Sequence, residues 1–160
     1  MTGLLLGTST LISRAAVDKS IRLRDTRYTH DQAVLAAQHD LVAFNSSIEV
    51  ALTGQAIVEV AAGRYVGGAA DFLRGAARSA GGVPVIALPS TAGRSAAGTA
   101  SRIVARLSGP AGLSRADAGV IVTEYGVADL RGLSLVRRRE RMIAIAHPDH
   151  RAALESAAAN

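Results

Sequence analysis

The sequence has no cysteine and no tryptophan, and aromatic residues make up only 3% of its 160 residues. The absence of cysteine excludes disulfide bonds and thiolate metal sites, and it fits a reducing compartment, so we expect a cytoplasmic protein. With so few aromatic side chains, a core has to be built from Ala, Val, Leu and Ile. No apolar run reaches the length of a membrane span, and the start of the chain lacks the features of a signal peptide. We therefore expect no membrane partner.

Lysine is nearly absent as well. The net charge is +5, but Lys19 is the only lysine among 18 basic residues. Arginine can bind phosphate and carboxylate with two hydrogen bonds, so an anionic ligand is compatible with this composition. The arginines are spread along the chain without aromatic side chains beside them, and nucleic-acid binding is therefore not expected. The densest cluster, residues 137–141, lies at helical spacing, and we interpret it as a solvated helix face.

What the chain does contain is 49% hydrophobic residues against 19% charged residues, which is typical of a globular protein. We expect one domain over residues 1–160, of the α/β class. The predicted strands are residues 1–7, 41–45, 47–52, 57–62, 83–88, 103–107 and 120–123, with residues 21–28 either an edge strand or an extended segment. The predicted helices are residues 11–17, 33–38, 69–80, 135–146 and 148–158.

Local signals refine this prediction. Thr29 is expected to cap the helix over 33–38, and Ser134 the helix over 135–146. Three short strands between residues 41 and 60 are expected to form a meander. Apart from the strand at 103–107, residues 94–119 are rich in Gly, Ser, Ala and Arg and are interpreted as loop.

A glycine pair, Gly67-Gly68, joins a predicted strand to the predicted helix over 69–80. Glycines let the backbone turn tightly and approach a ligand, while the first helical amides and the helix dipole suit an oxyanion or a phosphate. A simple turn is the alternative interpretation. Asp71, in the first turn of that helix, most simply complements the helix dipole.

Polar residues also follow predicted strands at two other places, Ser90 and Glu124. Ligands of open α/β sheets collect beyond the carboxyl ends of strands. Glu124 follows a strongly apolar strand, so it is either a partly desolvated carboxylate or the partner of an arginine such as Arg131 or Arg102. No P-loop, dinucleotide fingerprint or Gly-x-Ser-x-Gly elbow is present, and the histidines lack the spacing of a metal site.

Six blocks, taken in order, resemble the acetyl-CoA hydrolase/transferase family, which includes four-hydroxybutyrate and acetate CoA-transferases. The resemblance runs from about residue 3 to residue 154 and is limited to the C-terminal domain of that family. The blocks are 45–55 (NSSIEVALTGQ), 67–76 (GGAADFLRGA), 87–92 (ALPSTA), 101–104 (SRIV), 122–132 (VTEYGVADLRG) and 145–151 (IAHPDHR).

The resemblance implies a layered α/β/α domain with a largely parallel mixed sheet. It also implies covalent catalysis, in which a glutamate attacks an acyl-CoA thioester and passes CoA between carboxylic acids. None of Glu49, Glu59, Glu124, Glu140 or Glu155 stands in the motif of that glutamate. We therefore expect the nucleophile to belong to an N-terminal half that this chain does not carry.

Carried over by position, the Gly67 and Gly68 amides would form the oxyanion side of the CoA-thioester site. Glu124 would be a supporting polar wall residue, and Asn45 its neighbour. His30 would contact the substrate or CoA, although the family usually has Asn there. Gln32 replaces a proline, Tyr65 a common glycine, and Ala69 a polar residue.

The expected ligands are an acyl-CoA and a small carboxylic acid, with CoA thioester as substrate and no permanently bound cofactor or metal. A separate N-terminal half and a homo-oligomer are the expected partners. An acyl-CoA hydrolase part and an inactive remnant that binds CoA are the alternatives. A nicotinamide-dependent enzyme is disfavoured because the fingerprint is absent.

Overall fold

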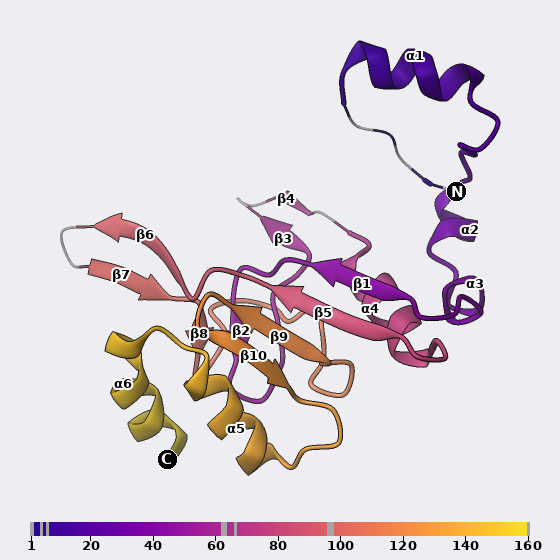
Figure 1. Ribbon diagram of the computed structural model, residues 1–160. Helices are drawn as coiled ribbons and strands as arrows, with labels where there is room; N and C mark the ends of the chain where they lie inside the picture. The colour runs from indigo at the N-terminus through magenta and orange to yellow at the C-terminus, as the bar shows by residue number, and fades with distance from the viewer. Residues whose placement is uncertain are drawn as a thin grey trace.

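The structure is a computed structural model, and it describes residues 2–3, 5, 7–61, 64–65, 67–95 and 98–159. Figure 1 shows the chain running from α1, set apart at the N-terminal side, through a central sheet to two C-terminal helices. The helices are α1 (Ser9–Val17), α2 (Thr26–Thr29), α3 (Gln32–Ala36), α4 (Ala69–Arg78), α5 (Leu135–Ala144) and α6 (Pro148–Ala159). The strands are β1 (Val42–Asn45), β2 (Val50–Ala51), β3 (Val60–Ala61), β4 (Arg64–Tyr65), β5 (Val83–Ala87), β6 (Thr91–Ser95), β7 (Gly98–Ser101), β8 (Ile103–Val104), β9 (Val120–Thr123) and β10 (Gly126–Asp129).

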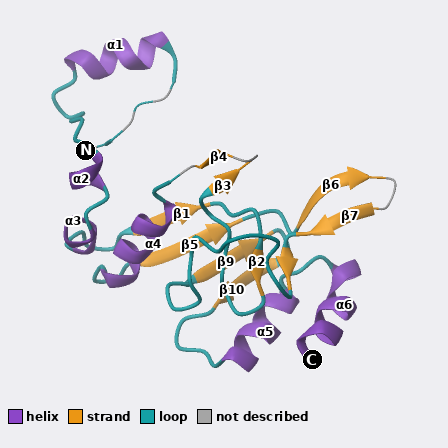
Figure 2. Ribbon diagram, turned by 180° about the vertical axis from the view of Figure 1, so that it is seen from behind, coloured by secondary structure: helices purple, strands orange, loops and turns teal. Residues whose placement is uncertain are grey.

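The central sheet has the strand order β1-β5-β9-β10. β1, β5 and β9 are parallel, and β10 returns antiparallel to β9 after a tight turn. The helix α4 lies between β4 and β5 in the chain and packs against β1 and β5, as Figure 2 shows from behind. The predicted α/β class and largely parallel mixed sheet are therefore confirmed. Since α4 runs back to the start of β5, its first turn faces the end of the sheet where the parallel strands finish.

One face of the sheet is packed into the core. Its side chains come from neighbouring positions of successive strands, and Ala43, Ile86, Ile121 and Ala128 are each 5% exposed or less. Leu73 and Ala76 of α4 and Met142 of α5 belong to the same core cluster. Burial of these aliphatic side chains is the main stabilising contribution, because each removes apolar surface from water.

The opposite face of the sheet, which we call the open face, exposes apolar side chains on its two outer strands, whereas Val85 and Val120 of the central strands are buried. Val42 and Phe44 of β1 are 55% and 68% exposed, and Val127 of β10 is 60% exposed. Parallel sheets are normally covered on both faces. The open face is therefore unusual for this sheet type.

Several predicted elements are confirmed. The helices at 11–17, 69–80, 135–146 and 148–158 correspond to α1, α4, α5 and α6, and the Ser134 side chain accepts a hydrogen bond from the amide of Arg137 as an N-cap. The strands at 41–45, 83–88 and 120–123 correspond to β1, β5 and β9. These are the segments in which apolar spacing and flanking turn residues agree.

Other predictions are wrong, and most of them concern strand partners. The meander does not form, because β1 pairs with β5, β2 with β8 and β3 with β4. The predicted loop at 94–119 contains β7, which pairs with β6 in a hairpin, and β10 was not predicted at all. Ile57 and Val58 precede β3, while Ala62, also within the predicted strand, lies outside the described residues.

Corrections at the N-terminus have clear causes. The predicted strand over 1–7 appears only as an isolated bridge between Thr2 and Leu23, with Met1, Leu4 and Leu6 outside the described residues. Thr29 does not cap α3, because it is the last residue of α2. The side chain of Asp31 instead accepts hydrogen bonds from the amides of Ala33 and Val34. An aspartate directly before the helix is the better cap.

The arginine cluster of α5 is only partly a solvated face. Arg137 pairs with Glu140 at 2.8 Å on the surface. The half-buried Arg138 guanidinium instead donates to the backbone carbonyls of Thr53 and Arg115, which lie in two distant loops. Arg138 therefore ties these loops to α5.

Candidate functional site

The first turn of α4 presents backbone amides without a side-chain cap. Gly68 is the N-cap residue, with φ 106° and ψ −22°, and as a glycine it has no side chain to cap the helix. A positive φ of this size is adopted freely only by glycine. Gly67, just before it, is exposed. The predicted glycine junction therefore exists as a tight turn into a helix whose N-cap residue carries no side chain.

His30 lies directly against this turn. Its Nε2 is 2.8 Å from the position that a Cβ on Gly68 would take, so no larger residue fits there without moving the ring. On its other side, the His30 ring meets Phe72 edge-on with centroids 5.0 Å apart. Its Nδ1 is 3.0 Å from the Thr29 hydroxyl, which leaves Nε2 facing the glycine turn. Two residues that were predicted separately, His30 and Gly68, are thus brought into contact.

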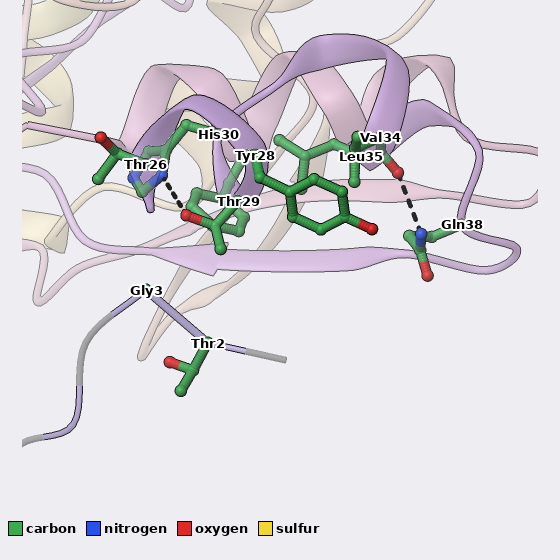
Figure 3. Close-up of a pocket in the computed structure, with 10 residues that line it drawn as sticks. Thr2, Gly3, Thr26, Tyr28, Thr29, His30, Val34, Leu35 and Gln38 are labelled. Carbon is green, nitrogen blue, oxygen red and sulfur yellow. Dashed lines mark hydrogen bonds between the residues drawn. The ribbon is translucent and has the colours of Figure 1, made fainter. Parts of the chain in front are cut away.

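A cavity of about 620 Å³ opens on the other side of His30. Its apolar wall consists of Tyr28, Val34, Leu35 and Phe72, from three successive helices (Figure 3). Thr2, Gly3, Thr26, Thr29 and Gln38 complete the lining, and no charged side chain contributes to it among the described residues. This size is in the range of small-molecule sites.

Glu124 lies in the turn between β9 and β10, and both of its carboxylate oxygens are bound by one residue. The Ser90 hydroxyl donates to Oε1 at 2.6 Å and the Ser90 amide to Oε2 at 2.8 Å. The hydroxyl bond is the main cause that lowers the pKa of Glu124, and nearby His147 acts in the same direction. Glu124 is therefore ionised at neutral pH.

The interpretation of Glu124 as the partner of an arginine is wrong, because its hydrogen-bond partner is Ser90. The residue is exposed, and desolvation only partly offsets the hydrogen bonds that lower its pKa. Arg131 pairs with Asp129 at 2.7 Å, and Arg102 donates to the carbonyl of Ile48. Ser90 itself is fully buried, so its hydroxyl is not accessible as a nucleophile. The pair is a structural clamp between the ends of two strands.

Asn45 ends β1, where it is opposite Ile86 of β5 and half-buried. Because β1, β5 and β9 are parallel, Asn45 lies at the same sheet edge as the Ser90–Glu124 pair. Within the described part of the chain, no hydrogen bond or ring contact joins this edge cluster to His30 or Gly68. Direct contacts therefore link His30 with Gly68 and Ser90 with Glu124.

Sequence reasoning did not single out Tyr28, Val34, Leu35 and Phe72 as cavity walls. Only a helical apolar pattern marks them, and that pattern is equally typical of core residues. It also missed the contact of His147 with Tyr125, whose rings are 5.3 Å apart. Across the described ranges, no group of three or more His, Asp or Glu side chains is placed to hold a metal ion. The described helices include none with the length and apolar character to cross a membrane.

Comparison with known proteins identifies the domain type. The family model described as the acetyl-CoA hydrolase/transferase C-terminal domain matches residues 7–158. The 4-hydroxybutyrate coenzyme A transferase of Clostridium kluyveri is 37% identical over 94% of this chain and 35% of its own length. The solved 4-hydroxybutyrate CoA-transferase of Porphyromonas gingivalis superimposes with a TM-score of 0.82 at 40% identity, over 97% of this chain and 35% of that chain. RipA of Yersinia pestis gives a TM-score of 0.81 at 40% identity, over 89% of this chain and 32% of that one.

Proposed function

Since the chain belongs to the acetyl-CoA hydrolase/transferase family, as its C-terminal domain, we propose that it supplies the CoA-thioester side of an acyl-CoA:carboxylate CoA-transferase site. The reaction would be of the acetate or 4-hydroxybutyrate type. The Gly67 and Gly68 turn would be the oxyanion side of this site, and His30 would contact the bound thioester. Coenzyme A thioester would be the substrate, and a small carboxylic acid the acceptor.

The observation that carries this proposal is the backbone at Gly68. Its positive φ directs the chain into α4 with the first amides uncapped, and the neighbouring Gly67 is exposed. When a carboxylate attacks a thioester, negative charge develops on the carbonyl oxygen. Helical amides that need no rearrangement are well suited to stabilise that charge.

The carboxylate that attacks would come from outside this domain. The chain spans about a third of the length of the relatives that it matches. Glu124 is a poor nucleophile, because hydrogen bonds from Ser90 occupy both of its oxygens. We propose that a glutamate in the part of the transferase fold that this chain does not cover forms the glutamyl-CoA thioester. Glu124 and Asn45 would only shape the cleft edge.

The open face supports a partner of this kind. Its exposed Val42, Phe44 and Val127 would be removed from water by a covering polypeptide. The covering polypeptide would be the remaining part of a transferase, in the same or another chain, and a second copy of this chain is the alternative partner in a homo-oligomer.

A reconstitution experiment tests the proposal. The chain would be assayed for CoA transfer from acetyl-CoA to butyrate, alone and with a polypeptide covering the remaining part of the C. kluyveri relative. We expect no transfer by the chain alone and transfer by the mixture. Release of CoA without an acceptor acid would indicate a hydrolase instead. Full turnover by the chain alone would contradict the need for an outside nucleophile, and the lack of any CoA binding would favour an inactive remnant.

A further inference from the structure

The cavity beside His30 has walls that suit an uncharged hydrocarbon group. Tyr28, Val34, Leu35 and Phe72 supply the apolar surface. Of the polar lining groups, the Gln38 amide already donates to the carbonyl of Val34, and the Thr29 hydroxyl is engaged with His30 and with the carbonyl of Asp25. A charged group would therefore find no ionic partner among these walls, whereas a hydrocarbon group would place its surface against them.

His30 connects this cavity to the first turn of α4. The same ring lines the cavity, meets Phe72 edge-on and lies against Gly68. A thioester carbonyl held at the Gly67 and Gly68 amides would have His30 as its immediate neighbour. The acyl group attached to that carbonyl would then reach the cavity by passing one side chain.

We propose that this cavity is the acyl subsite and that it selects uncharged acyl groups longer than acetyl over acyl groups with a second carboxylate. The identity of the ligand rests on the proposed function, while the preference for an uncharged hydrocarbon rests on the cavity walls alone. Each methylene buried from water is worth about 0.8 kcal/mol, which corresponds to roughly fourfold in affinity. A volume of about 620 Å³ exceeds the needs of an acetyl group and accommodates a hexanoyl chain.

The test is a titration of the chain with acetyl-, butyryl-, hexanoyl- and succinyl-CoA, followed by amide ¹H–¹⁵N NMR spectra. Shifts at Gly67 and Gly68 report the thioester site, and shifts at Val34, Leu35 and Phe72 report the cavity. We expect affinity to rise from acetyl to hexanoyl by roughly fourfold per buried methylene. Succinyl-CoA is expected to bind at least about tenfold more weakly than butyryl-CoA, with no shift at the cavity residues.

A matched pair of variants locates the effect. Val34→Phe adds volume inside the cavity, whereas Val127→Phe makes the same change on β10, where the side chain is 60% exposed and does not line the cavity. Val34→Phe should abolish the gain from acetyl to hexanoyl, and Val127→Phe should retain it. Identical series for the two variants would overturn the proposal.

The outcomes also separate the two levels of inference. Equal affinities across the wild-type series, with shifts at Gly67 and Gly68 but none at the cavity, would overturn the acyl subsite and leave the proposed function standing. Chemical-shift changes at Val34, Leu35 and Phe72 without changes at Gly67 and Gly68 would support the proposed acyl subsite. They would contradict the proposed thioester site at the glycines. An absence of shifts at both places would contradict both. Because the wild-type series decides these cases, the result does not depend on whether Val34→Phe folds.

Discussion

The two polar groups in this domain are built for different purposes. At the sheet edge, Ser90 is buried and binds both oxygens of Glu124, so every strong polar atom of that pair has a partner. At the start of α4, Gly68 has no side-chain cap, and the His30 Nε2 faces a bare backbone turn. Satisfied polar groups hold a structure in place, whereas unsatisfied amides at a helix start remain available to a ligand. We therefore expect the first group to stabilise the fold and propose a binding role for the second.

The largest effect is expected from Gly68→Ala. Alanine at φ 106° is strained, and its Cβ would lie 2.8 Å from the His30 Nε2. We expect unfolding to become easier by about 1–2 kcal/mol, together with the loss of acyl-CoA shifts at this turn. Gly109→Ala is a suitable control, because its Cβ would meet only the Ile57 side chain at 3.6 Å. Urea unfolding and the same NMR titration measure both effects, and normal acyl-CoA binding by Gly68→Ala would remove the binding role.

A smaller change in stability is expected when the hydrogen bonds between Ser90 and Glu124 are weakened. Ser90→Ala removes the hydroxyl that donates to Glu124 at 2.6 Å, and we expect a loss of about 1 kcal/mol in the free energy of unfolding. Glu124→Gln, made alone and together with Ser90→Ala, completes a double-mutant cycle that isolates the pair. A coupling near zero in urea unfolding would show that the clamp is not structural. Acyl-CoA binding should stay close to that of the wild type.

The clamp also predicts a dependence on pH. The pKa of Glu124 lies below its ordinary value of 4.5, mainly because the Ser90 hydroxyl donates to the carboxylate. A lowered folded-state pKa means that the stabilisation is fully present above pH 4.5 and is lost as the pH falls through the folded-state value. The difference in stability between wild type and Glu124→Gln should therefore shrink below pH 4.5, and a constant difference down to pH 2 would contradict the lowered pKa. The pKa of Asp129 is lowered in the same way in both proteins, so its contribution to the pH dependence of stability cancels in the difference.

Neither group was fully predictable from the sequence, because both depend on contacts between distant segments. Ser90 and Glu124 are 34 residues apart, and a buried serine after a strand carries no signal of its partner. The Gly67-Gly68 turn was predicted, since glycines between a strand and a helix have a local meaning. Its contact with His30 was not, because it depends on how α3 packs against α4.

The helices and strands also differ in how well the sequence predicts them. α4, β5 and β9 are predictable because their apolar runs are bounded by glycine, proline or polar turn residues. The β6–β7 hairpin was missed because its segment, apart from Arg94, is made of Gly, Ser, Ala and Thr, which lack the alternation of a half-buried strand. Pairing order is set by packing of the whole sheet, and so the meander prediction failed although the strand at 41–45 was nearly right.

A small change in stability is expected from His30→Asn, which replaces the ring beside Gly68 by a shorter side chain. The variant loses the edge-on contact with Phe72, which is worth about 0.5–1.5 kcal/mol, and the ring nitrogen that lies 3.0 Å from the Thr29 hydroxyl. If the group at α4 serves binding, urea unfolding should show no loss beyond these contacts, while the acyl-CoA affinity changes severalfold. His39→Asn provides a control, because it makes the same change at an exposed histidine that does not line the cavity. Equal acyl-CoA affinities for wild type and His30→Asn would mean that His30 only fills space beside Gly68. The glycine turn alone would then carry the binding role.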